Sequence, residues 1–288
     1  MHEDMIIPIG ELKFFVEGFS IRKIYILFFI SFIILFFNEP IFADDVATEL
    51  AKKSENPVEK MVTIPFNNNI NYGYGPKNNT QYVLDIKPVI PFKLSDYWNL
   101  ITRTIIPVVH QPNLIGSGYV NGVGDINPTL FLSSAHPGKI LWGIGPAFIL
   151  PTASNKQLGQ GKYSVGPSIV VLTMPNNWVV GILMNNVWSI GGETSRPYVN
   201  QFTMQYFINY NFQHGWFITS APVVTADWTQ NSNNRWTIPL GLGVGRVFNI
   251  GKQAISTSIQ TYDNVVTPKV LGAKWQLELS ISLLFPET

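Results

Sequence analysis

Alternation of apolar and polar side chains along long segments is the feature that most constrains this chain. The stretch 201-QFTMQYFINYNF-212 has an apolar residue at every even position and a neutral polar residue at every odd position except Phe207. Successive side chains of a β-strand point to opposite faces, so this segment has one apolar face and one hydrogen-bonding face. The same alternation recurs at 140–150, 236–244 and 275–285. A chain of this kind must cover several large apolar faces, either with a second sheet or with lipid.

Proline and glycine clusters divide the chain from residue 61 onward into twelve segments of about 11 to 15 residues. The segments are 61–74, 80–92, 98–111, 122–133, 139–151, 162–174, 177–190, 199–212, 215–228, 234–248, 253–264 and 273–285. Most strands of globular proteins have about 5 or 6 residues, whereas a tilted strand needs about 9 to 11 to cross a bilayer. The connections alternate between mostly long and mostly short, which is typical of membrane barrels with long loops on the cell exterior.

Composition and backbone chemistry indicate that lipid, and not a second sheet, covers the apolar faces. Only 13% of the residues are charged, against about 25% in a typical soluble domain. Backbone groups in hydrocarbon must all be paired, which a closed sheet achieves. We predict an all-β fold, a transmembrane antiparallel up-and-down β-barrel of twelve strands over residues 61–288, with apolar faces toward lipid and polar faces toward the lumen. A secreted soluble β-sandwich that binds sugars or proteins remains the alternative, with its apolar faces covered by a second sheet.

The N-terminal region predicts export. Arg22 and Lys23 precede the apolar run 24-IYILFFISFIILFF-37, and Ala43 follows before two aspartates. The run is shorter than the roughly 20 residues of a spanning helix, so residues 1–43 are predicted to be a cleaved signal peptide with an atypical N-terminal extension. Residues 44–60 are expected to be a flexible periplasmic lead-in.

The last strand and the charge balance bear on location and partners. The aromatic Phe285 near the C-terminus resembles the recognition signal of bacterial outer-membrane barrels. We therefore expect the cell outer membrane as the location, its lipid as the surroundings and the barrel-assembly machinery as a partner. The 19 basic and 18 acidic residues nearly balance, so the net charge gives no indication of a nucleic-acid partner.

Tryptophan marks the predicted strand ends. An indole has an apolar body and an N–H group that needs a partner, so it is stable at the boundary between hydrocarbon and headgroups. All eight tryptophans lie within about three residues of a predicted strand end, and we expect them to form an aromatic girdle: Trp98, Trp142, Trp178, Trp188, Trp216, Trp228, Trp236 and Trp275. A soluble sandwich capped by tryptophan would explain two or three of them.

Polar positions of the alternation give the candidates for the lumen. They are Asp85, Lys87, Arg103, Asp125, Asn127, Gln205, Asn209, Asp227, Gln260 and Glu278. A Lys or Arg facing lipid near the midplane costs about 2 to 4 kcal/mol, so Lys87 and Arg103 should point inward. The charges either line a path for a solute or pair across a filled barrel, because twelve strands fall between the sizes that hold only side chains and those that leave an aqueous channel. We predict a channel or transporter for small solutes, aromatic or hydrophobic ones included.

An enzyme barrel of the lipase or protease type is the rival prediction, with a histidine as general base. The exported chain offers His110, His136 and His214, of which the last two fall in short turns. No serine and carboxylate near His110 in sequence can be assigned to it, although triad members meet in space and not in sequence. The glycine-rich stretches 116–122 and 241–245 lead into no helix, as a phosphate-cradling loop requires. No catalytic residue, metal site or cofactor is predicted.

Several strings resemble one family. They are 122-GVGDINP-128, 142-WGIGPAFILPTA-153, 163-YSVGPS-168, 215-GWFITSAPVVTADW-228 and 235-RWTIPLGLGVGRVF-248. They look like a group of Gram-negative outer-membrane proteins catalogued as meta-pathway phenol-degradation (MetA-like) or transporter proteins, some under the misapplied name neuromedin U. The resemblance covers nearly all of the exported chain. It implies a twelve-stranded barrel with a transport role, and it brings no catalytic residues.

Overall fold

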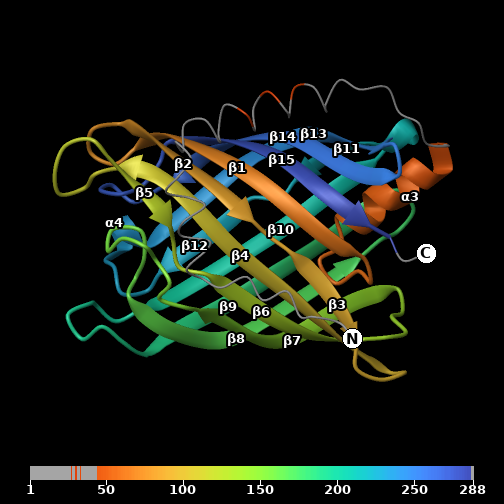
Figure 1. Cartoon of the computed structure of the whole chain (residues 1–288), viewed down its shortest axis with the longest axis horizontal. Helices are drawn as coiled ribbons and strands as arrows, with labels where there is room; N and C mark the ends of the chain where they lie inside the picture. The colour runs from red at the N-terminus through yellow and green to blue at the C-terminus, as the bar shows by residue number, and fades with distance from the viewer. Residues whose placement is uncertain (1–26, 28–29, 31–32, 34–43, 287–288) are drawn as a thin grey trace.

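Backbone pairing runs from strand to strand around a closed ring in this computed structural model, which describes residues 27, 30, 33 and 44–286 (Figure 1). The strands are β1 (Val62–Tyr74), β2 (Asn79–Ile86), β3 (Val89–Lys93), β4 (Trp98–Pro112), β5 (Tyr119–Val123), β6 (Asn127–Ser134), β7 (Ile140–Ile149), β8 (Lys162–Thr173), β9 (Trp178–Gly192), β10 (Asn200–Asn211), β11 (Trp216–Ser220), β12 (Val223–Asp227), β13 (Trp236–Ile250), β14 (Gln253–Val266) and β15 (Trp275–Phe285). The helices are α3 (Asp44–Ser54), η1 (Gln213–Gly215) and α4 (Ser232–Arg235). The predicted signal peptide and its cleavage site at Ala43 lie outside the described residues, apart from positions 27, 30 and 33.

The fifteen strands make twelve crossings, because three crossings consist of two strands each. The breaks fall at Lys87–Pro88, at 124–126 and at Ala221–Pro222. Proline has no N–H group for the ladder, which explains two of the breaks. β1 pairs with β15 along eleven residue pairs and closes the ring. The predicted twelve-stranded antiparallel barrel is confirmed, and the closed sheet is incompatible with the alternative of a β-sandwich.

The two faces of β10 follow the predicted alternation. Ile208 is exposed on the outer face, whereas Asn209 and Asn211 are fully buried inside the barrel. Phe207, the exception to the pattern, points inward and packs in a buried apolar cluster with Phe131 and Leu183. The break in the alternation therefore marks an apolar cluster within an interior that is otherwise polar along β10.

The tryptophans form two groups at opposite ends of the strands. We call the end where β1 begins and β15 stops the α3 end, and the opposite end the loop end (Figure 1). Strand direction places Trp98, Trp142, Trp178 and Trp216 near the α3 end and Trp188, Trp228, Trp236 and Trp275 near the loop end. Neighbouring rings touch, with centroids 6.1 Å apart for Trp98 and Trp142 and 5.4 Å apart for Trp228 and Trp236. Both groups flank the exposed apolar band, as interfacial indoles do.

The segment before the first strand differs from the expected flexible lead-in. Residues Asp44–Ser54 form α3, which packs against the α3 end of the barrel (Figure 1). Leu50 and Ala51 of this helix are buried with Phe217, Val247 and Leu284 of the wall. Burial of an apolar stripe orders a short helix that would be marginal alone. Across the described residues, no helix combines the length and the apolar character needed to span a membrane.

Candidate functional site

The lumen holds a larger cavity toward the loop end, with a volume of about 560 Å³. Most of its polar wall consists of amide side chains: Asn69, Asn71, Gln81, Gln111, Asn127, Gln157, Gln160, Asn185, Gln201, Gln205 and Gln276. Several of these amides bond to one another across the strands. Asn71 donates to Gln81 over 2.9 Å, and Gln81 donates to Gln111 over 2.9 Å. The larger cavity therefore presents neutral donors and acceptors held in fixed positions.

A smaller cavity of about 160 Å³ lies toward the α3 end. Six residues line both cavities, and we call this shared set the junction: Lys87, Arg103, Leu183, Gln205, Ala221 and Glu278. The break in the wall at Ala221–Pro222 lies at the junction. Here the Ala221 carbonyl accepts a bond from Gln205 over 3.0 Å, and the Ala221 N–H donates to the Tyr262 hydroxyl over 3.2 Å. Side chains thus bond to the backbone N–H and carbonyl groups of Ala221, which have no partner strand at the break.

The charges of the junction differ in how they are paired. Lys87 Nζ, at the break after β2, lies 3.5 Å from a carboxylate oxygen of Asp85 near the end of that strand. Glu278 accepts hydrogen bonds from Asn67 over 3.2 Å and from Gln260 over 2.8 Å. The ion pair of Lys87 joins it to a neighbour in the chain, and the bonds to Glu278 come from neutral amides, so whether these charges serve a solute or hold the barrel together stays a prediction.

The structure brings most of the predicted lumen residues together. The larger cavity is lined by Asp85, Lys87, Arg103, Asp125, Asn127, Gln205 and Glu278, and the smaller one by Gln260 and by the junction. Asn209 lies deeper, where its amide donates to Glu55 over 3.2 Å. Asp227 lies at the loop end, where it accepts bonds from the backbone and hydroxyl of Thr229, and it lines neither cavity. A solute contact for these residues stays a prediction.

The N-terminal segment closes the lumen at the α3 end, which the sequence did not predict. Ser54, Glu55, Asn56 and Pro57 line the smaller cavity. Val58 is buried in the apolar cluster that also contains Ile101, Phe131, Val170, Leu172, Val179, Leu183 and Phe207. The segment is polar and rich in charge, so no apolar period marks its docking. We call residues 55–61 the stopper.

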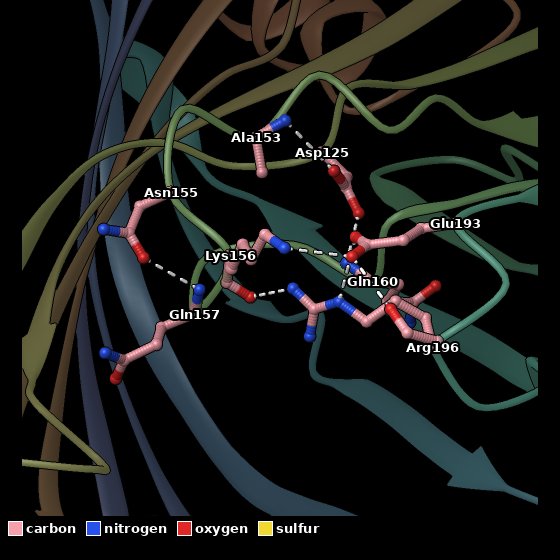
Figure 2. Close-up of polar contacts among 9 residues, drawn as sticks. Asp125, Ala153, Asn155, Lys156, Gln157, Gln160, Glu193 and Arg196 are labelled. Atoms are coloured by element: carbon pink, nitrogen blue, oxygen red, sulfur yellow. Dashed lines mark hydrogen bonds and ion pairs between the residues drawn. The ribbon is translucent and has the colours of Figure 1, made fainter.

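A loop folds inward at the opposite end (Figure 2). Asp125, at the break between β5 and β6, accepts bonds from the backbone N–H groups of Ala153 over 3.2 Å and Gln160 over 2.6 Å. Gln157 to Gln160 line the larger cavity as a result. Gly122 makes room, because an added Cβ would lie 2.0 Å from the Ser154 hydroxyl. The carboxylate of Asp125 therefore holds loop 150–161 over the mouth of the lumen.

An exposed ion-pair group joins this loop to the next one (Figure 2). Lys156 Nζ lies 3.0 Å from one carboxylate oxygen of Glu193, and Arg196 Nε lies 3.6 Å from the other. Arg196 also donates to the Lys156 carbonyl. The bonds from Lys156 and Ser195 lower the pKa of Glu193 below its ordinary value. Exposed pairs of this kind contribute little individually, so the Asp125 anchor is the stronger restraint on the loop.

His110 lies on the outer face of β4, because the opposite face carries the odd-numbered residues that line the lumen. Its Nδ1 atom bonds to the Asn121 side chain, and its ring stacks on Tyr119 with centroids 4.4 Å apart. His136 and His214 lie in turns at the α3 end. In the described part of the chain, no serine hydroxyl is hydrogen-bonded to His110, and no three metal-ligating side chains gather.

Comparisons with known proteins bear on the fold. No protein-family model matches the chain, and no curated protein matches it. An outer membrane channel from Pseudomonas putida F1 is similar, with a TM-score of 0.58 and 14% identity over 78% of this chain and 94% of the channel. A FadL homologue from Pseudomonas aeruginosa gives a TM-score of 0.39 and 9% identity over 78% of this chain and 89% of that protein. The phospholipase A from the outer membrane of Escherichia coli gives 0.36 and 10% identity over 85% of this chain and 99% of the enzyme. The first likeness shows that this chain shares the fold of a bacterial outer membrane channel.

Proposed function

We propose that this protein is a channel of the bacterial outer membrane for small solutes, hydrophobic and aromatic ones included. The observation that carries the proposal is the pair of cavities, about 560 and 160 Å³, that share a lining at the junction inside a closed barrel. A purely structural barrel would fill this space with side chains. The proposal includes export by the N-terminal signal peptide and membership of the MetA-like family. It also includes recognition of the strand that ends at Phe285 by the barrel-assembly machinery.

The mixed chemistry of the lumen wall supports the choice of solute. Both cavities combine polar groups with apolar side chains, among them Ile105 and Phe148 in the larger cavity and Val89, Phe207 and Phe217 in the smaller one. A small solute with an apolar body and a polar group can contact both kinds of side chain and leave water at the apolar ones. His110 bonds to Asn121 on the outer face without a serine hydroxyl, so the geometry supports transport better than hydrolysis.

Reconstitution tests the proposal. Purified protein is incorporated into planar bilayers for conductance and into liposomes for swelling with benzyl alcohol, glycerol and a trisaccharide as probes. Liposomes with protein should admit the two small probes faster than empty liposomes and exclude the trisaccharide. Because the stopper lines the smaller cavity, a variant with Val58→Asp should conduct more than the wild type. Absence of conductance and of swelling from both proteins would rule out a channel.

A further inference from the structure

One cation in the lumen, Arg103, makes no direct contact with a carboxylate in the part of the chain that the structure describes. Among the described residues, neither a hydrogen bond nor an ion pair joins the Arg103 guanidinium to another group. Its side chain lines both cavities, so the N–H groups are open to a solute at the junction. Asp85 attracts the guanidinium without direct contact. A partly buried guanidinium whose N–H groups have no acceptor is still costly, and a bound anion reduces that cost.

The neighbouring carboxylates are already engaged. Asp85 is 3.5 Å from Lys87 Nζ and accepts from Asn69 over 3.1 Å. Glu278 accepts from two amides, those of Asn67 and Gln260. Arg103 is therefore left as the cation available to a ligand at the junction, even though the lumen as a whole contains both signs of charge.

The walls next to Arg103 are apolar. Ile101 and Ile105 flank it on the lumen face of β4, and Val89 lies opposite it on β3. Ile101 belongs to the buried apolar cluster, and Leu183 of the junction lies in the same cluster. A ligand that bonds to Arg103 thus meets apolar side chains with the rest of its body.

We propose that Arg103 binds the carboxylate of a small solute with an apolar body, such as an aromatic or short aliphatic monocarboxylate. The planar fork of a guanidinium matches the two oxygens of a carboxylate in a bidentate pair, which a lysine cannot reproduce. This inference rests on the proposed function, because the lumen is the route by which a solute reaches the junction. It specifies the charge and the polarity of the solute that the proposed channel would admit.

Calorimetric titration of the full, purified barrel tests the inference with three probes of one shape: benzoate, benzyl alcohol and benzylamine. The wild type should bind benzoate at least about tenfold more tightly than benzyl alcohol, because a bond to a charged group is worth more than a neutral one. Arg103→Gln should reduce the affinity for benzoate to that for benzyl alcohol. The matched control is Arg246→Gln, which removes a guanidinium that lies over the Trp216 ring on the outer face of the barrel.

The outcomes separate this inference from the proposed function. Equal affinities of the wild type for benzoate and benzyl alcohol would overturn the inference without any variant, and so would full benzoate binding by a folded Arg103→Gln barrel. Retention of the unboiled, compact band on gels shows that a variant is folded. Benzoate binding that needs Arg103 in a protein that admits no solute would uphold the site and overturn the channel. Solute flux without a preference for benzoate would uphold the channel and overturn the site.

Discussion

Replacement of Glu55 by Gln should hold the stopper in place at every pH. Glu55 precedes the first strand, lines the smaller cavity and accepts a hydrogen bond from Asn209. Burial, with a smaller contribution from Glu278, raises the pKa of Glu55 from the ordinary 4.5 to about 7. Lys87 and Arg103 also line this cavity. Burial nevertheless dominates the shift, so the seated stopper favours the protonated acid.

The sign and the size of the effect follow from proton linkage. Below pH 4.5 the carboxyl group is protonated in both the seated and the released stopper. Between pH 4.5 and about 7 the released state binds fewer protons, so seating weakens as the pH rises. Above about pH 7 the loss of free energy of seating no longer changes with pH. It amounts to about 2 to 3 kcal/mol for a side chain that is only partly buried.

Conductance in planar bilayers measures this effect directly. Wild-type conductance should rise between pH 5 and pH 8, whereas that of Glu55→Gln should stay at the low value. The control is Glu49→Gln on α3, whose side chain is 58% exposed, and it should behave as the wild type does. A second measurement compares tryptic cleavage after Lys60 with cleavage after Lys269 in loop 267–274 of the same molecule. A pH-dependent rise in Glu55→Gln as large as that of the wild type would refute the reasoning.

Two further substitutions test the loop end and the apolar cluster. Gly122→Ala should displace loop 150–161 and raise conductance. The added Cβ would lie 2.0 Å from the Ser154 hydroxyl, and Gly122 has a φ of +153° that L residues rarely adopt. Gly138→Ala, at a site with open space, is the control, and equal conductance of the two variants would contradict the anchoring of the loop. Phe131→Ala should destabilise the barrel by about 3 to 5 kcal/mol, which is measured as a lower temperature for loss of the compact gel band. Leu132→Ala on the outer face should lower this temperature less. An equal decrease for the two variants would argue against an apolar interior at that level.

The strands could be predicted from sequence because each of them is a repeated local pattern. The alternation in 201–212 is set by the pleat of one strand and by what lies on its two faces. Even its exception, Phe207, carried information, since an apolar residue on the polar face has to meet another apolar group inside. The position of the tryptophans near strand ends was predictable from the same segmentation, whereas their role as an aromatic girdle at the membrane boundary stays a prediction.

The two closures of the lumen could not be predicted, because each depends on partners that are far apart in the chain. Asp125 accepts bonds from residues 28 and 35 positions away, at Ala153 and Gln160. Asn209 and Glu55 are separated by 154 positions. A polar segment that docks through isolated buried side chains, Asn56, Val58 and Met61, has no period by which it could be recognised. Local patterns therefore define the wall of the barrel, whereas long-range contacts decide what its lumen contains.

Opposing contributions act on the stopper, which suits a closure that has to open. Full burial of Val58 and of Met61 stabilises the seated stopper by roughly 1.5 to 3 kcal/mol each, and Glu55 opposes seating by about 2 to 3 kcal/mol above pH 7. The ladder of the wall does not pass through residues 55–61, since β1 begins at Val62 and pairs with β2 and β15. The cost in free energy of moving the stopper out of the lumen is therefore lower above pH 7 than below pH 4.5, and the barrel stays closed when the stopper leaves.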